Sequence, residues 1–406
     1  MSGNSGLNKL LDRGDVEWKR LGDLGELVRG NGLQKKDFTE TGVPAIHYGQ
    51  LYTYYGMFTE TTKSFVSPEL AKQLRKVDKG DVVLTNTSED FEGVCRALVY
   101  LGDRQAVTGG HATVFRPKSH ILGKYFAYFT QTEVFFQAKR KLTKGTKVLD
   151  VSATDMAKLT IPIPSPSDPK RSLEIQGEIV RILDTFTELT AELTAELTAR
   201  KKQYNYYRDQ LLRFDDGDIE WKTLGELVAT IKTGKLNANA MIEDGDYPFF
   251  TCDANPFRID TYAFDTEAII VSGNGSQVGH INYYNGKFNA YQRTYVLADC
   301  HASITMSFLL TYLKAHLRPY VMQHSKKGSV PYITMPMLQG LQVPVPSIKR
   351  QTEITQVLDK FDILTSSITE GLPREIELRQ KQYEYYRDLL LSFPKPDGIA
   401  IGSNDE

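Results

Sequence analysis

The chain has 406 residues, with 49 Lys and Arg against 50 Asp and Glu, and therefore a formal net charge of -1. This balance excludes a uniformly basic coat for nucleic acid, although it says nothing about where the charges lie. With 41% hydrophobic and 24% charged residues, the composition is typical of a globular protein, and the length suggests two or three domains.

The cysteines and the N-terminus indicate the compartment. Cys95, Cys252 and Cys300 lie far apart without a Cys-x-x-Cys pair, so neither a disulfide framework nor a thiolate zinc site is indicated. The first residues lack the apolar core of a signal peptide, and no stretch approaches the roughly 18 apolar residues of a membrane span. We expect a cytoplasmic protein without membrane contact.

An eight-residue motif near the start of the chain occurs twice. EWKRLGDL at 17–24 returns as EWKTLGEL at 220–227, identical at six of eight positions, and both tryptophans of the chain, Trp18 and Trp221, occupy the same place in it. Such a repeat is sought before any local assignment, because it determines the architecture.

The segment after the first motif predicts a compact mixed α/β domain with many loops. Short β-rich runs such as 82–84 are separated by Gly, Asn, Asp and Pro, and one helix is expected at 124–142. Several loops carry amide, hydroxyl and aromatic side chains suited to base edges, although for any single residue a core or turn role is the simpler interpretation. The candidates for DNA contact here are Gln50, Tyr52, Tyr54, Asn86 and Ser88.

A basic segment closes this domain. Residues 116–148 contain eight basic side chains and one acidic side chain, Glu133. Such a run is usually only a solvated face, but a Lys-Gly-hydroxyl triplet within it would let the backbone approach phosphates. The phosphate-contact candidates are Lys139, Arg140, Lys141, Lys144 and Thr146. The segment leads into a proline motif, IPIPSP, at 161–166.

A long helix is predicted from Glu174 to about Phe214. Apolar residues recur there at intervals of three and four, as on one face of a helix, and breakers are rare. About forty residues at ~1.5 Å each make a rod on the order of 60 Å, which needs a partner along its length.

The second half repeats this order. Its variable segment, with a β-rich run at 269–271 and an expected helix at 307–323, precedes VPVPSI at 343–348. The candidates for DNA contact here are Asn274, Ser276, Gln277, Tyr291, Gln292, Arg293, Lys326, Lys327 and Ser329. A second helix, 350–393, shares eleven of fifteen positions with the first over its last residues, and Gly371 and Pro373 predict a break in it. The two helices are expected to pair antiparallel.

Two modules in one chain have two interpretations. The repeat is either an old duplication without functional meaning, or it serves a target with two halves, for which DNA with two half-sites is the obvious example. No phosphate loop, H-E-x-x-H or G-x-S-x-G motif is present, and GNGSQVG at 273–279 has the wrong spacing and context for a dinucleotide site. No catalytic residue and no metal ligand is predicted, so the sequence indicates a binding protein.

The duplicated W-K-x-L-G-[DE] motif, the Pro-x-Pro motif and the repeated Q-Y-x-Y-Y-R-D helix end resemble the specificity subunits (HsdS) of type I restriction-modification systems. The segment 190–200, TAELTAELTAR, is similar to the TAEL repeat of the type IC branch. The resemblance covers 16–393.

The resemblance implies an α+β architecture: two mixed α/β target recognition domains separated by two long helices that form an antiparallel coiled coil with pseudo-twofold symmetry. The domains would be 1–170 and 216–348, the central spacer helix 171–215, the distal spacer helix 349–393 and a flexible tail 394–406. Each domain would read half of a bipartite, asymmetric target in double-stranded DNA.

The resemblance also implies partners. Two modification subunits, which methylate adenine with S-adenosylmethionine, and two restriction subunits, which use ATP and Mg²⁺, would join a noncatalytic chain that binds no cofactor itself. Partner contacts are expected at the repeated helix ends, at Tyr204, Tyr207, Arg208, Tyr383, Tyr386 and Arg387. The alternatives are a self-contained DNA methyltransferase or nuclease, and a coiled-coil scaffold that does not bind DNA.

Overall fold

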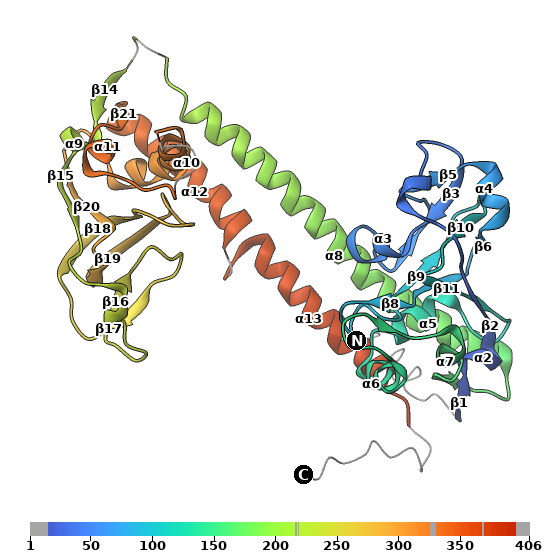
Figure 1. Ribbon diagram of the computed structural model, residues 1–406. Coiled ribbons are helices and arrows are strands. Elements are labelled where there is room, and N and C mark those ends of the chain that lie inside the picture. The colour runs from blue at the N-terminus through green and yellow to red at the C-terminus, as the bar shows by residue number, and fades with distance from the viewer. Residues whose placement is uncertain (1–14, 216, 218, 325–329, 368, 395–406) are drawn as a thin grey trace. The chain divides into compact units, whose positions relative to one another are not determined.

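The structure is a computed structural model that describes residues 15–215, 217, 219–324, 330–367 and 369–394. Contacts divide the chain into an N-terminal unit, Met1–Glu192 with Ile376–Glu406, and a C-terminal unit, Leu193–Glu375. Each unit contains one sheet domain and parts of two helical segments, so the described residues from Ile376 onward belong to the same unit as the first sheet domain (Figure 1).

Two main sheets form the sheet domain of the N-terminal unit. One has the order β2-β11-β7-β9-β4 and the other β5-β3-β10-β6. Their strands are β2 (Gly25–Arg29), β3 (Val43–Ile46), β4 (Phe58–Thr59), β5 (Ser64–Val66), β6 (Arg75–Val77), β7 (Val82–Thr85), β9 (Ala97–Tyr100), β10 (Ala106–Thr108) and β11 (Ala112–Pro117). The β-rich run predicted at 82–84 is confirmed as β7, whose four residues are all buried.

The helices of this domain are short. They are α3 (Tyr48–Thr53), α4 (Pro68–Gln73), α5 (Gly123–Phe129), α6 (Glu133–Leu142), α7 (Ala153–Met156) and a 3₁₀ turn at Lys35–Asp37. The prediction of one helix at 124–142 is wrong, because the helix stops at Phe129 and restarts at Glu133. The Thr132 hydroxyl accepts a hydrogen bond from the Phe135 amide, a cap that starts a new helix.

One six-stranded sheet forms the core of the sheet domain in the C-terminal unit, in the order β15-β20-β18-β19-β16-β17. Its strands are β15 (Val228–Thr233), β16 (Tyr247–Phe250), β17 (Phe257–Ile259), β18 (Phe264–Ser272), β19 (Ile281–Ala290) and β20 (Thr294–Cys300). A 3₁₀ turn lies at Ala238–Ala240, and the helices α10 (Met306–His324) and α11 (Met335–Gln339) follow the sheet. The run predicted at 269–271 is part of β18, and α10 corresponds to the helix predicted at 307–323.

The repeated motifs pair with each other inside each unit. In the N-terminal unit β1 (Val16–Arg20) pairs antiparallel with β13 (Thr160–Pro164), and Trp18 lies opposite Pro162. In the C-terminal unit β14 (Glu220–Thr223) pairs in the same way with β21 (Gln342–Val345), and Trp221 lies opposite Pro344. These two-stranded ribbons tolerate proline because each strand has a free edge. A short helix, α2 (Leu21–Leu24) or α9 (Leu224–Leu227), follows the opening strand in both units.

The long helices agree closely with the sequence prediction. α8 is continuous over Pro169–Leu211, a length of 43 residues. The second copy consists of α12 (Ile348–Ser366) and α13 (Gly371–Leu391), so the predicted break is confirmed. Gly371 has a φ of +76°, which residues with a Cβ rarely adopt, and Pro373 lies in the first turn of α13, where proline is tolerated.

Each unit contains a helix pair with an equivalent aromatic stack. In the N-terminal unit Phe186 of α8 stacks on Tyr386 of α13, with ring centroids 5.2 Å apart. In the C-terminal unit Tyr207 of α8 stacks on Phe361 of α12 at 5.7 Å. Within each pair the chains run in opposite directions (Figure 1). The antiparallel pairing that we predicted is therefore present in each unit.

The end of the described chain is part of the N-terminal core. Leu390 and Leu391 are 0% and 2% exposed and join one hydrophobic cluster with residues of α5, β13 and α8. Trp18 donates a hydrogen bond from Nε1 to the carbonyl oxygen of Pro394 at 2.7 Å, across 376 positions of sequence. These contacts pack the last described residues into the core of the N-terminal unit.

Leu390→Ala is therefore expected to destabilise the N-terminal unit, by about 2–5 kcal/mol, because truncating a buried leucine leaves a cavity. Each unit has one tryptophan, so urea unfolding of the Trp221→Phe background, followed by Trp18 fluorescence, reports this unit alone. Leu378→Ala is the matched control, since Leu378 is an exposed leucine of the same helix, 43% accessible. An unchanged midpoint for Leu390→Ala would contradict the packing described here.

Candidate nucleic-acid interface

Three segments of the N-terminal unit meet at a small ribbon of two strands, β8 (Thr87–Ser88) and β12 (Leu149–Asp150), which pair antiparallel. The Tyr52 hydroxyl, from α3, donates to the carbonyl oxygen of Thr87 at 2.6 Å. Lys144 forms an isolated backbone bridge with Asp150. The ribbon thus brings the tyrosine-rich helix and the Lys-Gly-Thr loop to the polar segment after β7. We call the residues Tyr52, Ser88, Arg140, Lys141, Lys144 and Thr146 the N-terminal polar surface.

The members of this surface differ in their exposure and contacts. Arg140, Lys141, Lys144 and Thr146 are exposed, and the Arg140 guanidinium lies 5.4 Å from the ring centroid of Phe91. Tyr52 and Ser88 are half-buried, and burial raises the pKa of Tyr52, so its hydroxyl stays protonated at neutral pH. The arrangement presents cations beside hydroxyl donors, the combination that contacts phosphates and base edges.

Gln50 of α3 and Tyr54, which directly follows α3, were expected at DNA and have other contacts. The Gln50 amide donates to the Ser64 hydroxyl at 2.6 Å, and its oxygen accepts from the His47 amide at the start of the helix. Tyr54 is 57% exposed, with the Lys63 ammonium 4.7 Å from its ring centroid. Gln50 is thus committed to holding α3, whereas Tyr54 is accessible.

Asn86 and Lys139 do not lie on the surface, and their prediction as DNA contacts is wrong. Asn86 is fully buried, donates to the carbonyl oxygen of Val151 at 2.8 Å and accepts from the Thr113 hydroxyl at 3.0 Å. Lys139 is 4% exposed, and its ammonium donates to the carbonyl oxygens of Glu92 and Val94. Both side chains satisfy buried backbone groups, which sequence composition cannot distinguish from a role at the surface.

Asp155 holds the basic loop in place. Its carboxylate accepts from the ammonium groups of Lys144 and Lys158, at 2.8 and 2.6 Å, and from the Ser152 hydroxyl at 2.9 Å. The hydrogen bonds from Lys144, Lys158 and Ser152 hold the pKa of Asp155 well below its ordinary value of 3.8. Lys144 remains 76% exposed in spite of this ion pair, so its ammonium is accessible to a second anion.

The Asp155 contacts predict a specific pH dependence. Since the folded-state pKa lies below the unfolded value, the stabilisation is complete above about pH 4 and is lost as the pH falls below it. Asp155→Asn should therefore lower the free energy of unfolding at neutral pH, and its difference from wild type should shrink toward pH 2. Asp103→Asn is the control, because Asp103 pairs with Lys79 in full contact with solvent and should contribute little. A difference that stays constant with pH would contradict this role.

The sequence did not predict one group of aromatic residues that lies beside this surface. The Tyr48 ring lies between the rings of His47 and His111, with centroids 4.7 Å away on each side. His111 is exposed, and its Nδ1 lies 3.1 Å from the Thr87 hydroxyl. Burial, Lys35 and His111 lower the pKa of His47, so that ring is neutral at pH 7. The only sequence signal was two glycines before His111, which is too weak to single it out.

Loops of the C-terminal unit meet around Gly273. The Gly273 amide donates to the carbonyl oxygen of Arg293 at 2.9 Å, and the Gly273 carbonyl accepts from the Ile333 amide at 2.7 Å. A Cβ at Gly273 would lie 2.1 Å from the Arg293 carbonyl oxygen, so only glycine allows this approach. The predicted loops 274–277 and 291–293 are therefore neighbours. We call the residues Asn274, Ser276, Gln277, Tyr291, Gln292 and Arg293 the C-terminal polar surface.

Exposure varies across the C-terminal polar surface as well. Ser276, Gln292 and Arg293 are exposed, whereas Asn274, Gln277 and Tyr291 are half-buried. The structure adds Tyr332, which is 52% exposed and forms a backbone bridge with Asn274, and Arg318, whose guanidinium donates to the Ser276 carbonyl at 3.5 Å. Neither was expected, because both are distant in sequence. Lys326, Lys327 and Ser329 lie outside the described residues.

The repeated helix ends present different tyrosines from those expected. Tyr383 is 8% exposed and donates to the Gln131 side-chain oxygen at 2.6 Å, and burial raises its pKa to about 12, so its prediction as a partner contact is wrong. Tyr204 is half-buried, and Tyr207 and Tyr386 are engaged in the two aromatic stacks. The guanidiniums of Arg208 and Arg387 pair with the adjacent Asp209 and Asp388. Tyr206 and Tyr385, at equivalent positions, are 62% and 64% exposed. Helical periodicity could have identified them as the outward-facing tyrosines.

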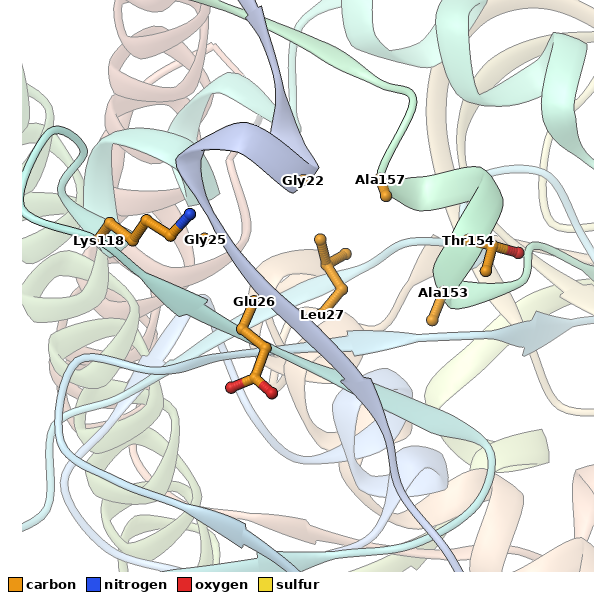
Figure 2. Close-up of a pocket in the computed structure, with 8 residues that line it drawn as sticks. All are labelled: Gly22, Gly25, Glu26, Leu27, Lys118, Ala153, Thr154 and Ala157. Atoms are coloured by element: carbon orange, nitrogen blue, oxygen red, sulfur yellow. The ribbon is translucent and has the colours of Figure 1, made fainter.

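A shallow pocket of about 490 Å³ lies on the N-terminal unit between β2 and α7. It is lined by Gly22, Gly25, Glu26, Leu27, Lys118, Ala153, Thr154 and Ala157. Figure 2 shows Leu27 between Gly22 and the Ala153–Ala157 segment, with the Lys118 ammonium toward Gly25. No residue of the N-terminal polar surface lines it.

Within the described ranges, no three His, Cys, Asp or Glu side chains are grouped so that they could hold a metal ion. Among the same residues, no helix combines the length and the apolar composition required to span a bilayer.

Comparison with known proteins identifies the family. The profile described as type I restriction modification DNA specificity domain matches residues 14–200 and 217–378. The chain is 35% identical to the EcoR124I/EcoR124II specificity subunit of Escherichia coli, over 98% of this chain and 100% of that protein. It is 32% identical to the EcoprrI specificity subunit of Escherichia coli, over 91% of this chain and 93% of that protein. The solved S subunit of a type I system from M. genitalium aligns with a TM-score of 0.62 at 17% identity, covering 94% of this chain and 97% of that one, and so shares the fold.

Proposed function

Because this chain belongs to the family of type I restriction-modification specificity subunits, we propose that its two sheet domains are target recognition domains for the two halves of one bipartite, asymmetric DNA sequence. The N-terminal and C-terminal polar surfaces contact the half-sites, and the paired helices set the length of the nonspecific spacer between them. The chain supplies sequence recognition to a complex.

The observation that carries this proposal is one frame repeated with two different sheets. Both units share the motif-to-motif strand pair and the aromatic stack between antiparallel helices. They differ in the sheets themselves, which are four- and five-stranded in one unit and six-stranded in the other. Two unlike half-sites require the same supporting strands and helices in both units, with a different recognition surface in each.

Direct readout supports the choice of polar loops as the reading surfaces. Gln292 and Arg293 are exposed on one unit, and Arg140, Lys141 and Lys144 on the other. Arginine and amide side chains pair bidentately with base edges in the major groove, while lysines near the backbone position the duplex. The local positive charge at 116–148 thus explains how a chain of net charge -1 holds DNA.

The catalytic activities belong, in this proposal, to partner subunits. Two modification subunits bind S-adenosylmethionine and methylate DNA, and two restriction subunits use ATP and Mg²⁺, while this chain is noncatalytic and binds none of these cofactors. The exposed Tyr206 and Tyr385 are the candidate contacts with the modification subunits, because they project from equivalent turns of the repeated helix ends. Large exposed aromatic residues are favoured anchors of protein interfaces.

Methylation mapping tests the proposal. DNA from cells that express this chain with its modification subunits should carry methyl groups at two short specific sequences separated by a fixed number of unspecified bases. Exchanging residues 224–341 for those of a relative should change one half of the target only. A methylated sequence without two separable halves would contradict the bipartite mechanism, and purified chain that methylates or cuts DNA unaided would favour the self-contained enzyme.

A further inference from the structure

Two glutamines occupy equivalent positions in the helices of the two units. Gln176 of α8 and Gln351 of α12 each lie seven residues before the leucine of the repeated Leu-Asp-x-Phe motif. Both are 0% exposed. A fully buried amide requires protein partners for its donors and its acceptor, so its position is set by the groups that it contacts.

Both side chains make the same contacts with their sheet domain. The Gln176 oxygen accepts from the Leu122 amide at 3.0 Å, and its Nε2 donates to the carbonyl oxygen of His120 at 3.0 Å. The Gln351 oxygen accepts from the Thr305 amide at 2.8 Å, and its Nε2 donates to the carbonyl oxygen of Ser303 at 2.8 Å. In each unit one amide thus bridges an N–H and the carbonyl two residues earlier.

The bridged backbone lies at the start of a domain helix in both units. Leu122 directly precedes α5, and Thr305 directly precedes α10. Each glutamine has a further bond to its own segment, from Nε2 to the Ser172 hydroxyl or to the Pro346 carbonyl oxygen. The glutamine therefore fixes both the position and the angle at which the domain helix begins, relative to α8 in one unit and to α12 in the other.

The two units differ in the other hydrogen bonds that join the domain helix to α8 or α12, a contact region that we call the junction. In the N-terminal unit Asp184 of α8 also accepts from the Lys124 ammonium and the Tyr128 hydroxyl, both at 2.8 Å. The carboxylate of the equivalent Asp359 of α12 forms no hydrogen bond or ion pair with the residues that the structure describes, and burial raises its pKa. Gln351 therefore supplies the main side-chain hydrogen bonds between α12 and its domain. In the other unit Gln176 and Asp184 both supply such bonds.

We propose that Gln176 and Gln351 are positioning residues that hold each recognition domain at one orientation on its helix and thereby restrict the spacer lengths that the subunit accepts. This inference rests on the proposed function and adds to it the residues that determine spacer selectivity.

A small tilt of the domain at the junction is enough to change the spacing of the recognition surfaces. A domain of about 150 residues has a radius of gyration of roughly 15 Å, so its far surface lies about 30 Å from the junction. A tilt of about 7° at the junction then displaces that surface by about one base-pair step, ~3.4 Å. Loss of two directional hydrogen bonds at the pivot is sufficient for such a change without unfolding the sheet.

The test uses the full chain in complex with its modification subunits. Initial methylation rates are measured on duplexes whose two half-sites are separated by the wild-type spacer and by spacers one and two base pairs longer or shorter. Gln351→Leu should reduce the preference for the wild-type spacer over its neighbours by about tenfold, and Gln176→Leu should reduce it less, because Asp184 still holds α5. The preferred bases within each half-site should stay the same.

Three controls separate positioning from general stability. Gln356→Leu and Gln210→Leu change exposed glutamines of the same helices and should leave the profile unchanged. Val83→Ala removes buried volume from a sheet and should lower thermal stability without altering spacer preference. If Gln351→Leu does not fold, Gln351→Met replaces it, since methionine has a similar length and volume and lacks both the acceptor for Thr305 and the donor to Ser303.

The outcomes are distinguishable. A wild-type complex without a preferred spacer contradicts the proposed function itself. A sharp wild-type optimum that a folded Gln351 variant preserves overturns only the positioning role. The positioning role is also overturned if Val83→Ala reduces the spacer preference as much as Gln351→Leu does, or if neither Gln351 variant folds. In both cases the glutamine would act through global stability.

Discussion

One additional Thr-Ala-Glu-Leu unit inserted after Leu197 is expected to lengthen the nonspecific spacer by one or two base pairs and to leave both half-sites unchanged. Four residues add about 6 Å and about 40° of helical rotation to α8. A DNA base pair advances about 3.4 Å and about 35°. Within the repeat, Leu193 and Leu197 are half-buried and the residues between them are exposed, so a whole unit preserves the pattern of the buried face. Methylation mapping measures the new spacing.

A single alanine inserted at the same place is the matched control. It turns the following helix by about 100°, which carries Tyr207 away from Phe361 and the buried face out of register. This variant should lose methylation rather than change the spacer. An unchanged spacer after the four-residue insertion would show that α8 does not measure the distance.

Replacing Arg140, Lys141 and Lys144 by alanine together should weaken DNA binding by about 150-fold, if each cation contributes roughly 1 kcal/mol through a phosphate contact. The slope of log affinity against log salt should fall by about 3, since each neutralised phosphate releases about one counterion. All three side chains are exposed, so thermal stability should change little apart from the Lys144 contact with Asp155. Titrations of the assembled complex at several salt concentrations provide the measurement.

For Lys139→Met, in the same basic segment, we expect the reverse of the triple variant, namely a change in stability without a change in DNA binding. Its ammonium is buried against two carbonyl oxygens, so the substitution should lower stability and leave the salt slope unchanged. If Lys139→Met reduced the salt slope and the triple variant did not, this region would contact DNA through a different face from the one proposed. Unaltered affinity in the triple variant would indicate that phosphates are held elsewhere.

Periodicity and repetition were sufficient to predict the helical frame. Apolar residues at intervals of three and four predicted α8, and Gly371 with Pro373 predicted the break between α12 and α13, because both signals are local and depend on backbone geometry alone. The same approach failed at Thr130–Thr132, where hydroxyl caps divide one amphipathic stretch into α5 and α6. A cap of this kind is a local signal that the apolar pattern concealed.

The site was less predictable than the frame. Polar residue types singled out loops such as 274–277 and 291–293, but they could not show that these loops meet at Gly273, nor that Tyr332 and Arg318 join them. Burial was the main source of error. Asn86, Lys139 and Tyr383 look like surface residues in the sequence, yet each is buried and hydrogen-bonded to another part of its unit. Exposure depends on contacts between distant segments, which composition does not contain.

The duplication of this protein, the variable domain and helix in each half, and the family of type I specificity subunits could all be predicted from the order of amino acids alone. These properties follow from repeated motifs and backbone periodicity, which are written along the chain. The three-dimensional structure was needed to show that the last described residues, through Leu390 and the Trp18 bond to Pro394, complete the first unit, and that Gln176 and Gln351 join domain to helix. Hydrophobic burial and buried hydrogen bonds select partners by position in space, across hundreds of residues, and not by proximity in sequence.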